Sequence, residues 1–258
     1  PEVLAQIEAR GDDAYNHARY LFSCAHYPAY ERSDAAYFPG GEPCFAAMLE
    51  ELEKGKQYIF LEFFIIGNGE MWGKILDILK RKAAAGLDVR VLYDDFGCIT
   101  RLPMRYCKKL REMGIEAHVF NPFIPVLSGR LNNRDHRKLM LIDGKVGYIG
   151  GYNLSDEYFG RARPYGVWKD TGLRLEGEAV RSLTASFFEL WNVTTKEDED
   201  FARYLNICHK VTSEGFVQPF NDNPLSEERT AENVYLNLIA QAEKTLYITT
   251  PYLIITDE

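Results

Sequence analysis

The sequence predicts an α/β fold in which helices flank a mixed, largely parallel β-sheet. Between residues 44 and 93, helical and strand-like segments alternate at the spacing that is typical of parallel strands joined by right-handed crossovers. From His136 to Asn153, two β-rich runs meet at Asp143–Gly144, and an Asp-Gly pair between such runs is a strong signal of a β-hairpin. The 258 residues, 46% of them apolar, supply enough material for the core of such a fold.

The elements follow in order along the chain. Residues 1–34 are expected to form a leader, helical from Pro1 to about Phe22, that packs outside the main domain of residues 35–215. In that domain, apolar residues at helical spacing predict the helices and continuous apolar runs predict the strands. Residues 121–131 are expected to be a loop, and the acidic run 197–200 a solvated boundary. The expected helices are Cys44–Glu53, Trp72–Ala85, Met104–Met113 and Val180–Asn192, and the expected strands are Tyr58–Ile66, Asp88–Tyr93 and Glu116–Phe120.

Two segments far apart in the chain share one pattern. Lys56–Ile66 (KQYIFLEFFII) and Lys244–Ile254 (KTLYITTPYLI), 188 residues later, are both Lys-led apolar strands preceded by a helical segment. The pattern suggests a tandem duplication. Residues 216–258 are then expected to be a linker and the start of a second, truncated repeat.

Charge and composition exclude several classes of protein. The formal net charge of -8 and the pI near 5.3 argue against a basic surface that wraps nucleic acid, so no nucleic-acid partner is expected. No run of apolar residues is long enough to predict a membrane-spanning helix. The five cysteines form no CxxC pair, and the closely spaced ligands of a structural metal site are missing, so no metal or other cofactor is expected.

The predicted hairpin brings polar side chains to one side of the sheet. A two-residue turn would place Lys138 opposite Ile149 and His136 opposite Gly151. Strand alternation then puts His136, Lys138, Gly151 and Asn153 on the same face. An imidazole, an ammonium and a carboxamide converge there, and the missing side chain of Gly151 leaves an open volume for a substrate atom. Such a cluster predicts an anion site suited to a tetrahedral phosphoryl group, with a nucleophile or base at its edge.

Two aspartates have alternative interpretations. Asp143 lies at the turn, with parity opposite to His136, and is better explained as a turn former than as a reacting group. A nucleophilic histidine needs an acceptor for its far nitrogen, and Asp170, which precedes a short strand, is a candidate. The sequence spacing alone leaves Asp170 equally consistent with an ordinary loop acid.

Three further residues are candidates for substrate binding. Glu62 interrupts one apolar strand and Asp94 ends the next, so either could face the site from a strand end. Both are equally consistent with buried acids that backbone donors satisfy. Arg134 belongs to a locally basic stretch around the hairpin that could attract an anion, although a solvated surface position explains any single arginine there as well.

The hairpin resembles the signature of a known family. His136, Lys138, Asp143, Gly150–Gly151 and Asn153 reproduce HxK(x)4D(x)6GGxN, which is similar to the HKD motif of the phospholipase D superfamily. The surrounding segments resemble bacterial cardiolipin synthases over roughly residues 35–258. These segments are YIFLEFFII, GLDVRVLYDDFG, FNPF, LNNRDHRK, IGGYNLSDEY, WKDTGLRLEG and YITTPYL.

The resemblance implies metal-free phosphoryl transfer through a covalent phosphohistidine. His136 would attack the phosphate of phosphatidylglycerol, Lys138 and Asn153 would hold its nonbridging oxygens, and Asp170 would orient the histidine. Asp143, the acid of the motif, is carried as a further catalytic candidate. A second phosphatidylglycerol would resolve the intermediate, which gives cardiolipin, and glycerol would leave in the first step.

The family pattern also contains features that this sequence lacks. Its members have two such motifs in one chain, and the second histidine acts on the leaving group and the acceptor. The repeat offset would place that histidine beyond Glu258, so a fragment with little activity of its own is expected, completed by a second HKD half or by a homodimer. The family usually has N-terminal membrane helices, which implies the cytoplasmic face of the cell membrane, with phosphatidylglycerol and anionic lipid as partners.

Two other functions fit the same motif. A hydrolytic phosphodiesterase would use water in the second step, and it would produce phosphatidic acid without cardiolipin from phosphatidylglycerol. A noncatalytic module that binds anionic head groups would be indifferent to a His136→Ala change.

Overall fold

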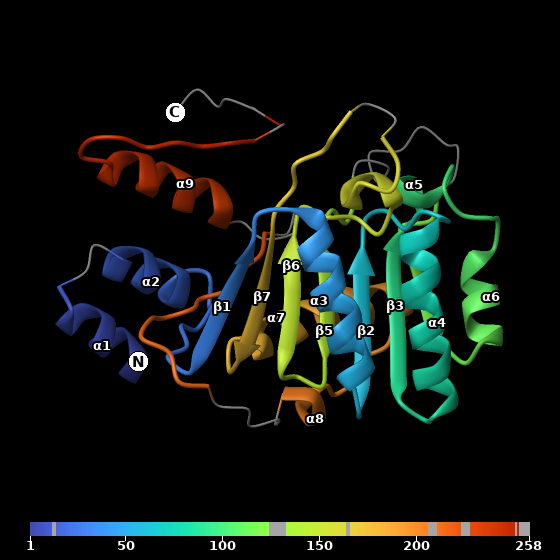
Figure 1. Cartoon of the computed structure of the whole chain (residues 1–258). Coiled ribbons are helices and arrows are strands. Elements are labelled where there is room, and N and C mark those ends of the chain that lie inside the picture. Colours follow the sequence, from blue (N-terminus) through green and yellow to red (C-terminus); the bar gives the residue numbers. More distant parts are fainter. Residues whose placement is uncertain are drawn as a thin grey trace. The chain divides into compact units, whose positions relative to one another are not determined.

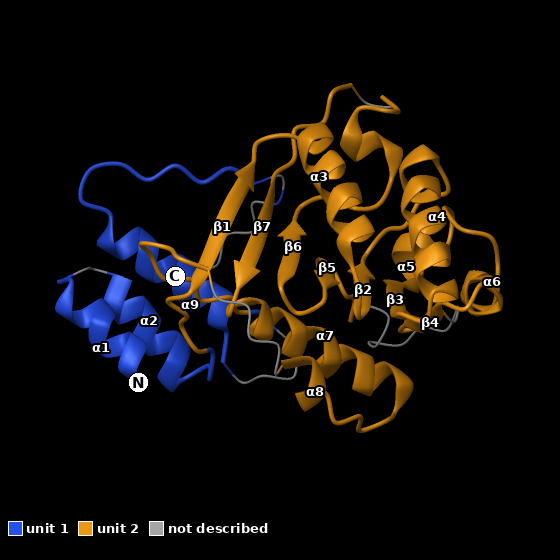
Figure 2. Cartoon of the chain, turned by 60° about the horizontal axis from the view of Figure 1, so that its bottom comes forward, with its two compact units in different colours: residues 1–27, 221–258 blue, residues 28–220 orange. Residues whose placement is uncertain are grey.

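The computed structural model describes residues 1–11, 14–123, 133–163, 166–205, 211–222, 228–250 and 252. The chain divides into two compact units, one of residues 28–220 and one that combines residues 1–27 with residues 221–258 (Figure 2). The larger unit contains the β-sheet and all candidate site residues.

The sheet of the larger unit is mixed. Its strands are β1 (Ser33–Phe38), β2 (Tyr58–Phe63), β3 (Asp88–Asp94), β4 (Glu116–Phe120), β5 (Lys138–Ile142), β6 (Val146–Gly150) and β7 (Gly172–Gly177), in the order β1-β7-β6-β5-β2-β3-β4 (Figure 1). Among the described strands, β2, β3 and β4 pair in parallel, and the other strand pairings are antiparallel. The mixed α/β fold is confirmed, but the parallel part is smaller than predicted. The hairpin and β7 extend the sheet with antiparallel strands, and β1, which crosses the predicted boundary between the leader and the main domain, joins them.

Helices cover both faces of the sheet (Figure 1). One face packs against α3 (Gly41–Lys54), α4 (Glu70–Ala84) and α6 (Tyr106–Glu112). The other face packs against α7 (Val180–Thr195), whose Phe187, Phe188 and Trp191 are fully buried, with α8 (Ala202–Leu205) beside it. Two short helices, α5 (Asp95–Cys98) and the 3-10 helix η2 (Asp156–Phe159), lie in the connections after β3 and β6. The predicted helices of this unit are therefore confirmed to within a few residues at each end.

Strand alternation assigns each β2 side chain to one of the two cores. Ile59, Leu61 and Phe63 face the α3–α4 layer, whereas Tyr58 and Phe60 face α7. Glu62 has the parity of Phe60 and therefore also points toward α7. By the same alternation, Lys138 and Leu139 at the start of β5 lie on opposite faces of the sheet, and Leu139 packs in the α7 core.

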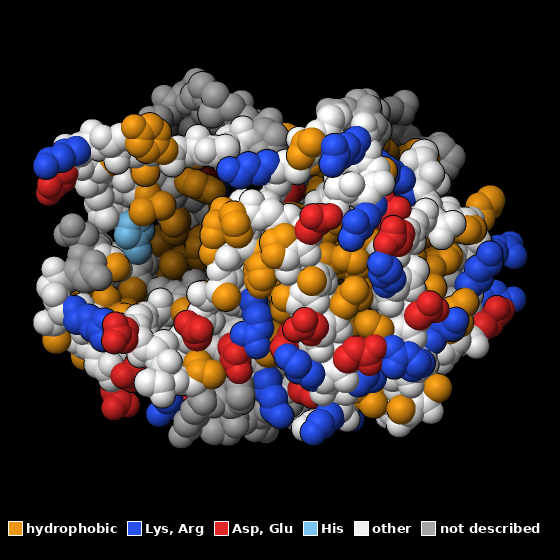
Figure 3. Space-filling view, in the orientation of Figure 1, with side chains coloured by type: hydrophobic (Ala, Val, Ile, Leu, Met, Phe, Trp, Pro, Cys, Tyr) orange, Lys and Arg blue, Asp and Glu red, His pale blue; other side chains and the backbone are white. Residues whose placement is uncertain are grey.

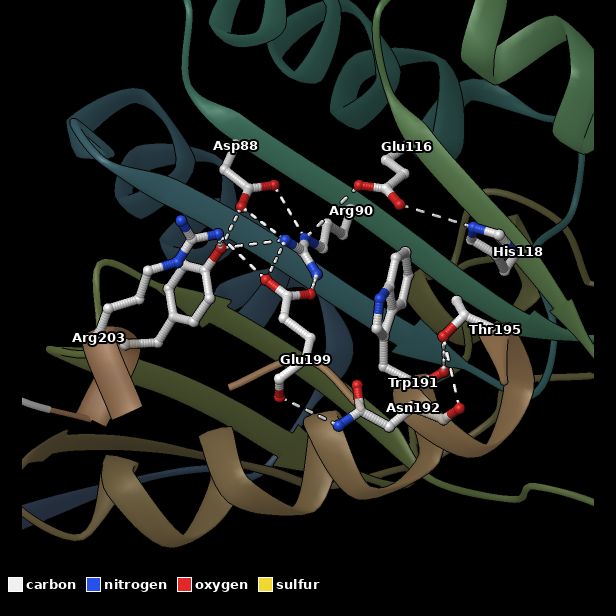
Figure 4. A network of polar contacts seen from close by, with 10 residues as sticks. Asp88, Arg90, Glu116, His118, Trp191, Asn192, Thr195, Glu199 and Arg203 are labelled. Atoms are coloured by element: carbon white, nitrogen blue, oxygen red, sulfur yellow. Dashed lines mark hydrogen bonds and ion pairs between the residues drawn. The ribbon is translucent and has the colours of Figure 1, made fainter. Parts of the chain in front are cut away.

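A buried arginine joins β3 to the α7–α8 layer (Figure 4). Arg90 is 5% exposed, and its guanidinium lies 2.6 Å from Glu199, 3.0 Å from Asp88 and 5.1 Å from the centre of the Trp191 ring. Ion pairs on both sides and aromatic rings around it offset the cost of burying the charge. The prediction that the acidic run is only a solvated boundary is therefore wrong for Glu199, which anchors the chain after α7.

The described part of the smaller unit contains three helices. It contains α1 (Glu2–Ala9), α2 (Ala14–Ser23) and α9 (Thr230–Gln241), which confirms the predicted helical segments at both ends of the chain. Residues 244–250 pair with no described strand, so the strand expected at 244–254 is not found there, and residues 251 and 253–258 lie outside the described residues. The duplication and the domain boundaries remain predictions. Across the described ranges, no helix combines the length and the apolar character needed to cross a bilayer.

Candidate active site

One edge of the sheet collects the candidate residues. The carboxyl ends of β2, β3 and β6 meet there with the amino ends of β5 and β7, because β5 is antiparallel to β2 and β7 is antiparallel to β6 (Figure 1). His136 lies two residues before β5, Asp170 lies two residues before β7, and Gly151 and Asn153 follow β6. Residues that are far apart in sequence are therefore brought to a common edge.

The hairpin turn has the predicted conformation but a different register. Asp143 and Gly144 have φ of +53° and +62°, and the Lys145 N–H donates to the Ile142 carbonyl at 3.0 Å, as in a type I′ turn. Ile142 nevertheless pairs with Val146, which leaves Lys145 as an extra residue. The Lys145 carbonyl accepts a hydrogen bond from Gly177 of β7 at 3.0 Å, so the neighbouring strand draws this residue out of the hairpin ladder.

The shifted register changes which residues face each other. Leu139 pairs with Ile149, so the prediction that Lys138 faces Ile149 and His136 faces Gly151 is wrong. His136 and Lys138 still share one side because they are two residues apart, and the neighbouring Leu139 packs in the α7 core.

Phe64 brings the imidazole and the ammonium together. The centre of its ring lies 4.9 Å from the centre of the His136 ring and 5.4 Å from Lys138 Nζ. The Lys138 ammonium also donates to the backbone carbonyl of His136. Lys138 is only 8% exposed, which is unusual for a lysine, and among the described residues no carboxylate forms an ion pair with it. The aromatic face and the carbonyl partly replace its lost hydration.

Burial shapes the charge of both groups. It lowers the pKa of Lys138 to about 8, although the charges of Asp135 and Asp170 act in the opposite direction. Burial, and secondarily the Lys138 charge, lowers the pKa of His136 below its usual value. At neutral pH the imidazole is therefore mainly in its neutral form, while most of the lysine carries its charge.

The structure brings Asp170 into this cluster through Gly151. A Cβ atom on Gly151 would lie 1.9 Å from Asp170 Oδ1, so the carboxylate occupies the space above the glycine. The expectation that Gly151 leaves an open volume for substrate is therefore wrong. Asp170 Oδ1 accepts a hydrogen bond from the Thr171 N–H at 2.8 Å, and its charge raises the pKa of Lys138. The absence of a side chain on Gly151 therefore leaves room for the Asp170 carboxylate.

Asn153 joins two of the segments at this edge. It is 2% exposed, its Oδ1 accepts from the Ile65 N–H at 3.0 Å, and its Nδ2 donates to the Tyr158 hydroxyl at 2.7 Å. The carboxamide therefore holds the chain directly after Phe64, the residue that contacts His136 and Lys138. The three predicted groups lie around one short segment, residues 64–65.

Asp143 lies at the other end of β5, away from His136. It is 5% exposed, and its carboxylate accepts hydrogen bonds from the N–H groups of Lys56 (2.9 Å), Gln57 (2.7 Å) and Tyr58 (2.9 Å). Both oxygens are used to hold the start of β2 against the hairpin. The structure thus agrees with a structural role for this residue and does not bring it to the His136–Lys138 cluster.

Asp94 and Arg134 support the segment that leads to His136. Asp94 is fully buried, caps α5 by accepting from the Phe96 N–H at 2.9 Å, and accepts from the Asp135 N–H at 3.1 Å. Arg134 donates to the Asn121 carbonyl at 2.8 Å, and its guanidinium lies 5.4 Å from the centre of the Phe96 ring. Asp94 is therefore a buried acid satisfied mainly by backbone donors, the second of its two interpretations.

Glu62 belongs to a buried charged cluster on the α7 side of the sheet. Its Oε1 lies 2.6 Å from Arg137 Nε, which is also 3.0 Å from Asp135 Oδ1. Burial raises the pKa of Glu62 well above its usual value, and the Asp135 charge adds to that effect despite the nearby guanidinium. Glu62 therefore lies outside the His136–Lys138 cluster. It interacts with Arg137 and Asp135, the residues on either side of His136.

Two residues of the site have no counterpart among the predictions. Phe64 lies in an apolar run, and its sequence gives no sign of contact with His136 or Lys138, because an aromatic residue there is most simply a core residue. Asp135 directly precedes His136, and its charge acts on both His136 and Lys138. Its proximity in sequence was the only available signal.

The fold and this edge cluster define a phospholipase D-like domain. Residues 48–191, more than half of the chain, match the family model described as cardiolipin synthase, PLD-like domain, and the chain belongs to this family. It is 36% identical to a cardiolipin synthase of Listeria innocua over 86% of this chain and 46% of that protein. It is 43% identical to an uncharacterized protein of Streptococcus mutans over 99% of this chain and 56% of that protein. The chain thus spans about half the length of the curated relatives it matches.

A solved structure has the same fold. The phosphatidylserine synthase of Haemophilus influenzae superposes with a TM-score of 0.60 at 14% identity, over 90% of this chain and 58% of that protein. At this identity the likeness concerns the fold alone.

Proposed function

We propose that this chain carries the nucleophilic half of a phosphatidyltransferase site that makes cardiolipin from two molecules of phosphatidylglycerol. The observation that supports this best is the His136–Phe64–Lys138 cluster. It holds a neutral imidazole beside a buried cation whose pKa is about 8, at the edge where Asp170 also lies. A lone pair next to a desolvated positive charge suits attack on an anionic phosphodiester.

The proposed reaction has two displacements at phosphorus. In the first, a nitrogen of His136 forms a bond to phosphorus, and the bond from phosphorus to the glycerol oxygen breaks. The departing oxygen takes a proton and leaves as glycerol. In the second, the terminal hydroxyl oxygen of another phosphatidylglycerol attacks phosphorus, its proton departs, and the phosphorus–nitrogen bond breaks to release cardiolipin.

Each residue at the edge has a distinct proposed role. Lys138 neutralises the charge on the nonbridging oxygens, and Asp170 accepts a hydrogen bond from the N–H group of the far imidazole nitrogen. Asn153 holds the segment after Phe64 and presents its remaining amide hydrogen to the phosphate. The proton for the leaving glycerol comes from a second histidine, supplied by another HKD segment in the same polypeptide or in a second copy of this chain.

The location and partners follow from the proposed substrate. Phosphatidylglycerol is an anionic membrane lipid, so we propose that the reaction takes place at the cell membrane, on the cytoplasmic face that the family resemblance implies.

A soluble substrate with a good leaving group tests the nucleophile by itself. Nitrophenolate leaves from bis(p-nitrophenyl) phosphate without prior protonation, so a half-site with only the nucleophile can complete the first displacement. We expect a burst of nitrophenolate that approaches one equivalent per chain, followed by slow turnover. The His136→Ala variant is the matched control and should show no burst. An equal burst from that variant would contradict the proposal.

The second step separates transfer from hydrolysis. With phosphatidylglycerol vesicles and a preparation in which both HKD segments are present, cardiolipin supports the proposal. Phosphatidic acid without cardiolipin would show that water resolves the intermediate, and the chain would then be assigned to a phosphodiesterase.

A further inference from the structure

An exposed basic segment follows β3 at the site edge. Between Phe96 and Arg111 the chain has five basic residues and no acidic residue, whereas the whole chain has a formal net charge of -8. Local charge of one sign on a protein of the opposite net charge indicates a surface that selects an anionic partner.

Large apolar side chains are exposed in the same segment. Phe96 is 54% exposed, Ile99 49% and Met104 90%. Met104 lies between Pro103 and the exposed Arg105, in a connection between α5 and α6 where its side chain has no packing role. Figure 3 shows lysine and arginine side chains together with apolar ones over α6. Exposed apolar groups next to cations are typical of surfaces that insert into the interface of an anionic membrane.

The cations differ in how far they are already neutralised. Arg101 forms an ion pair with Glu157 at 2.6 Å, and Lys108 lies 3.9 Å from Glu112. The helix α6 buries Tyr106, Cys107 and Leu110, so Lys109 lies on its exposed side. Arg105 and Lys109 are therefore the cations best placed to meet a partner.

This surface is connected directly to the nucleophile. The Phe96 ring stacks under the Arg134 guanidinium at 5.4 Å, two residues before His136. Asp94 caps the helix that carries Phe96 and also holds the Asp135 N–H, so one buried carboxylate fixes both segments. A bilayer that meets the basic segment would thus lie beside the edge that contains His136.

We propose that Phe96, Ile99, Met104, Arg105 and Lys109 form a docking surface for an anionic lipid bilayer. The apolar side chains enter the interfacial region, and the two cations pair with lipid phosphates. The surface would bring lipid head groups to the site edge, and this role rests on the proposed function. The binding of the surface to a bilayer does not depend on that function.

Vesicle flotation of the whole chain tests the docking surface. With phosphatidylglycerol vesicles, we expect the Arg105→Gln/Lys109→Gln variant to bind roughly 30-fold more weakly than the unaltered chain, since each cation near an anionic surface contributes roughly fivefold. Met104→Gln should reduce binding roughly tenfold through the lost apolar insertion. The matched control is Lys74→Gln/Lys80→Gln, which removes the same charge from α4, where both lysines are exposed. The control should bind like the unaltered chain.

Three outcomes would overturn the docking surface: no binding to the vesicles by the unaltered chain, equal loss in the control pair, or full binding by the Arg105/Lys109 variant. The burst with the soluble diester separates this proposal from the proposed function. If the burst is absent but vesicle binding depends on Arg105 and Lys109, only the proposed function fails. If the burst is present and binding is independent of them, only the docking surface fails.

Discussion

Gly151 offers a direct test of how Asp170 acts. In the Gly151→Ala variant the new Cβ would lie 1.9 Å from Asp170 Oδ1 and 2.6 Å from its Cγ. Ordinary contact begins at 3.4 Å, so the carboxylate must move by about 1.5 Å. A misplacement of about 1 Å in a positioning group can reduce a catalysed rate on the order of 100-fold, so we expect a loss of at least that size.

The assay is the rate of the nitrophenolate burst, measured in a double-mutant cycle. Asp170→Ala removes the atoms with which the new methyl group collides. Gly151→Ala should therefore reduce the rate strongly in the unaltered background and have little further effect in the Asp170→Ala background. The free energy of unfolding should change little, because the displaced group is the end of a partly exposed side chain.

Two results would refute this reasoning. One is a Gly151→Ala variant with an unchanged burst, which would show that the position of Asp170 does not matter. The other is an equal loss in both backgrounds, which would show that the alanine acts on something other than the carboxylate.

Three further predictions concern charge and stability. Because Lys138 loses its proton with a pKa of about 8, kcat/KM for the soluble diester should fall as the pH rises through that value. Lys138→Arg should remove this decrease at alkaline pH. If the decrease is unchanged in the variant, it belongs to another group. Asp143→Ala leaves three N–H groups without an acceptor and should lower the free energy of unfolding in urea by roughly 3 kcal/mol. Asp143→Asn should lower it less, and both variants should keep the nitrophenolate burst. A lost burst with unchanged stability would instead make Asp143 catalytic. Glu62 has a raised pKa in the folded state, so the folded chain binds its proton more tightly than the unfolded chain and stability falls as the pH rises above about 4.3. Glu62→Gln should flatten that dependence above about pH 4.3, and an unchanged or steeper dependence in urea titrations would contradict the assignment.

The local parts of the fold were predictable because each leaves a local pattern. The apolar runs of β2, β3 and β4 and the periodicity of α3, α4 and α7 appear directly in the sequence, and the Asp143–Gly144 turn was identified from two residues. The register of the hairpin was not predictable, because it depends on a hydrogen bond from Gly177, which is distant in sequence. β1 was missed because its sequence, SDAAYF, begins with two polar residues and shows no clear alternation.

The candidate site was predictable in its members more than in their contacts. His136, Lys138 and Asn153 reach the same short segment after β2, as the motif suggested. The function of Gly151 was misjudged because the space above a glycine depends on what a distant loop places there, and Asp170 fills it. Glu199 was misread and Phe64 was not identified for the same reason: their partners, Arg90 and His136, come from other parts of the chain.

The phosphohistidine itself provides the most direct test of the central claim. The chain is mixed with bis(p-nitrophenyl) phosphate, quenched in alkali during the burst, and analysed by mass spectrometry of its peptides. We predict a nitrophenyl phosphoryl group on the imidazole of His136, stable in alkali and lost in acid. A burst with the group on another residue, or with no covalent adduct during the burst, would contradict the account.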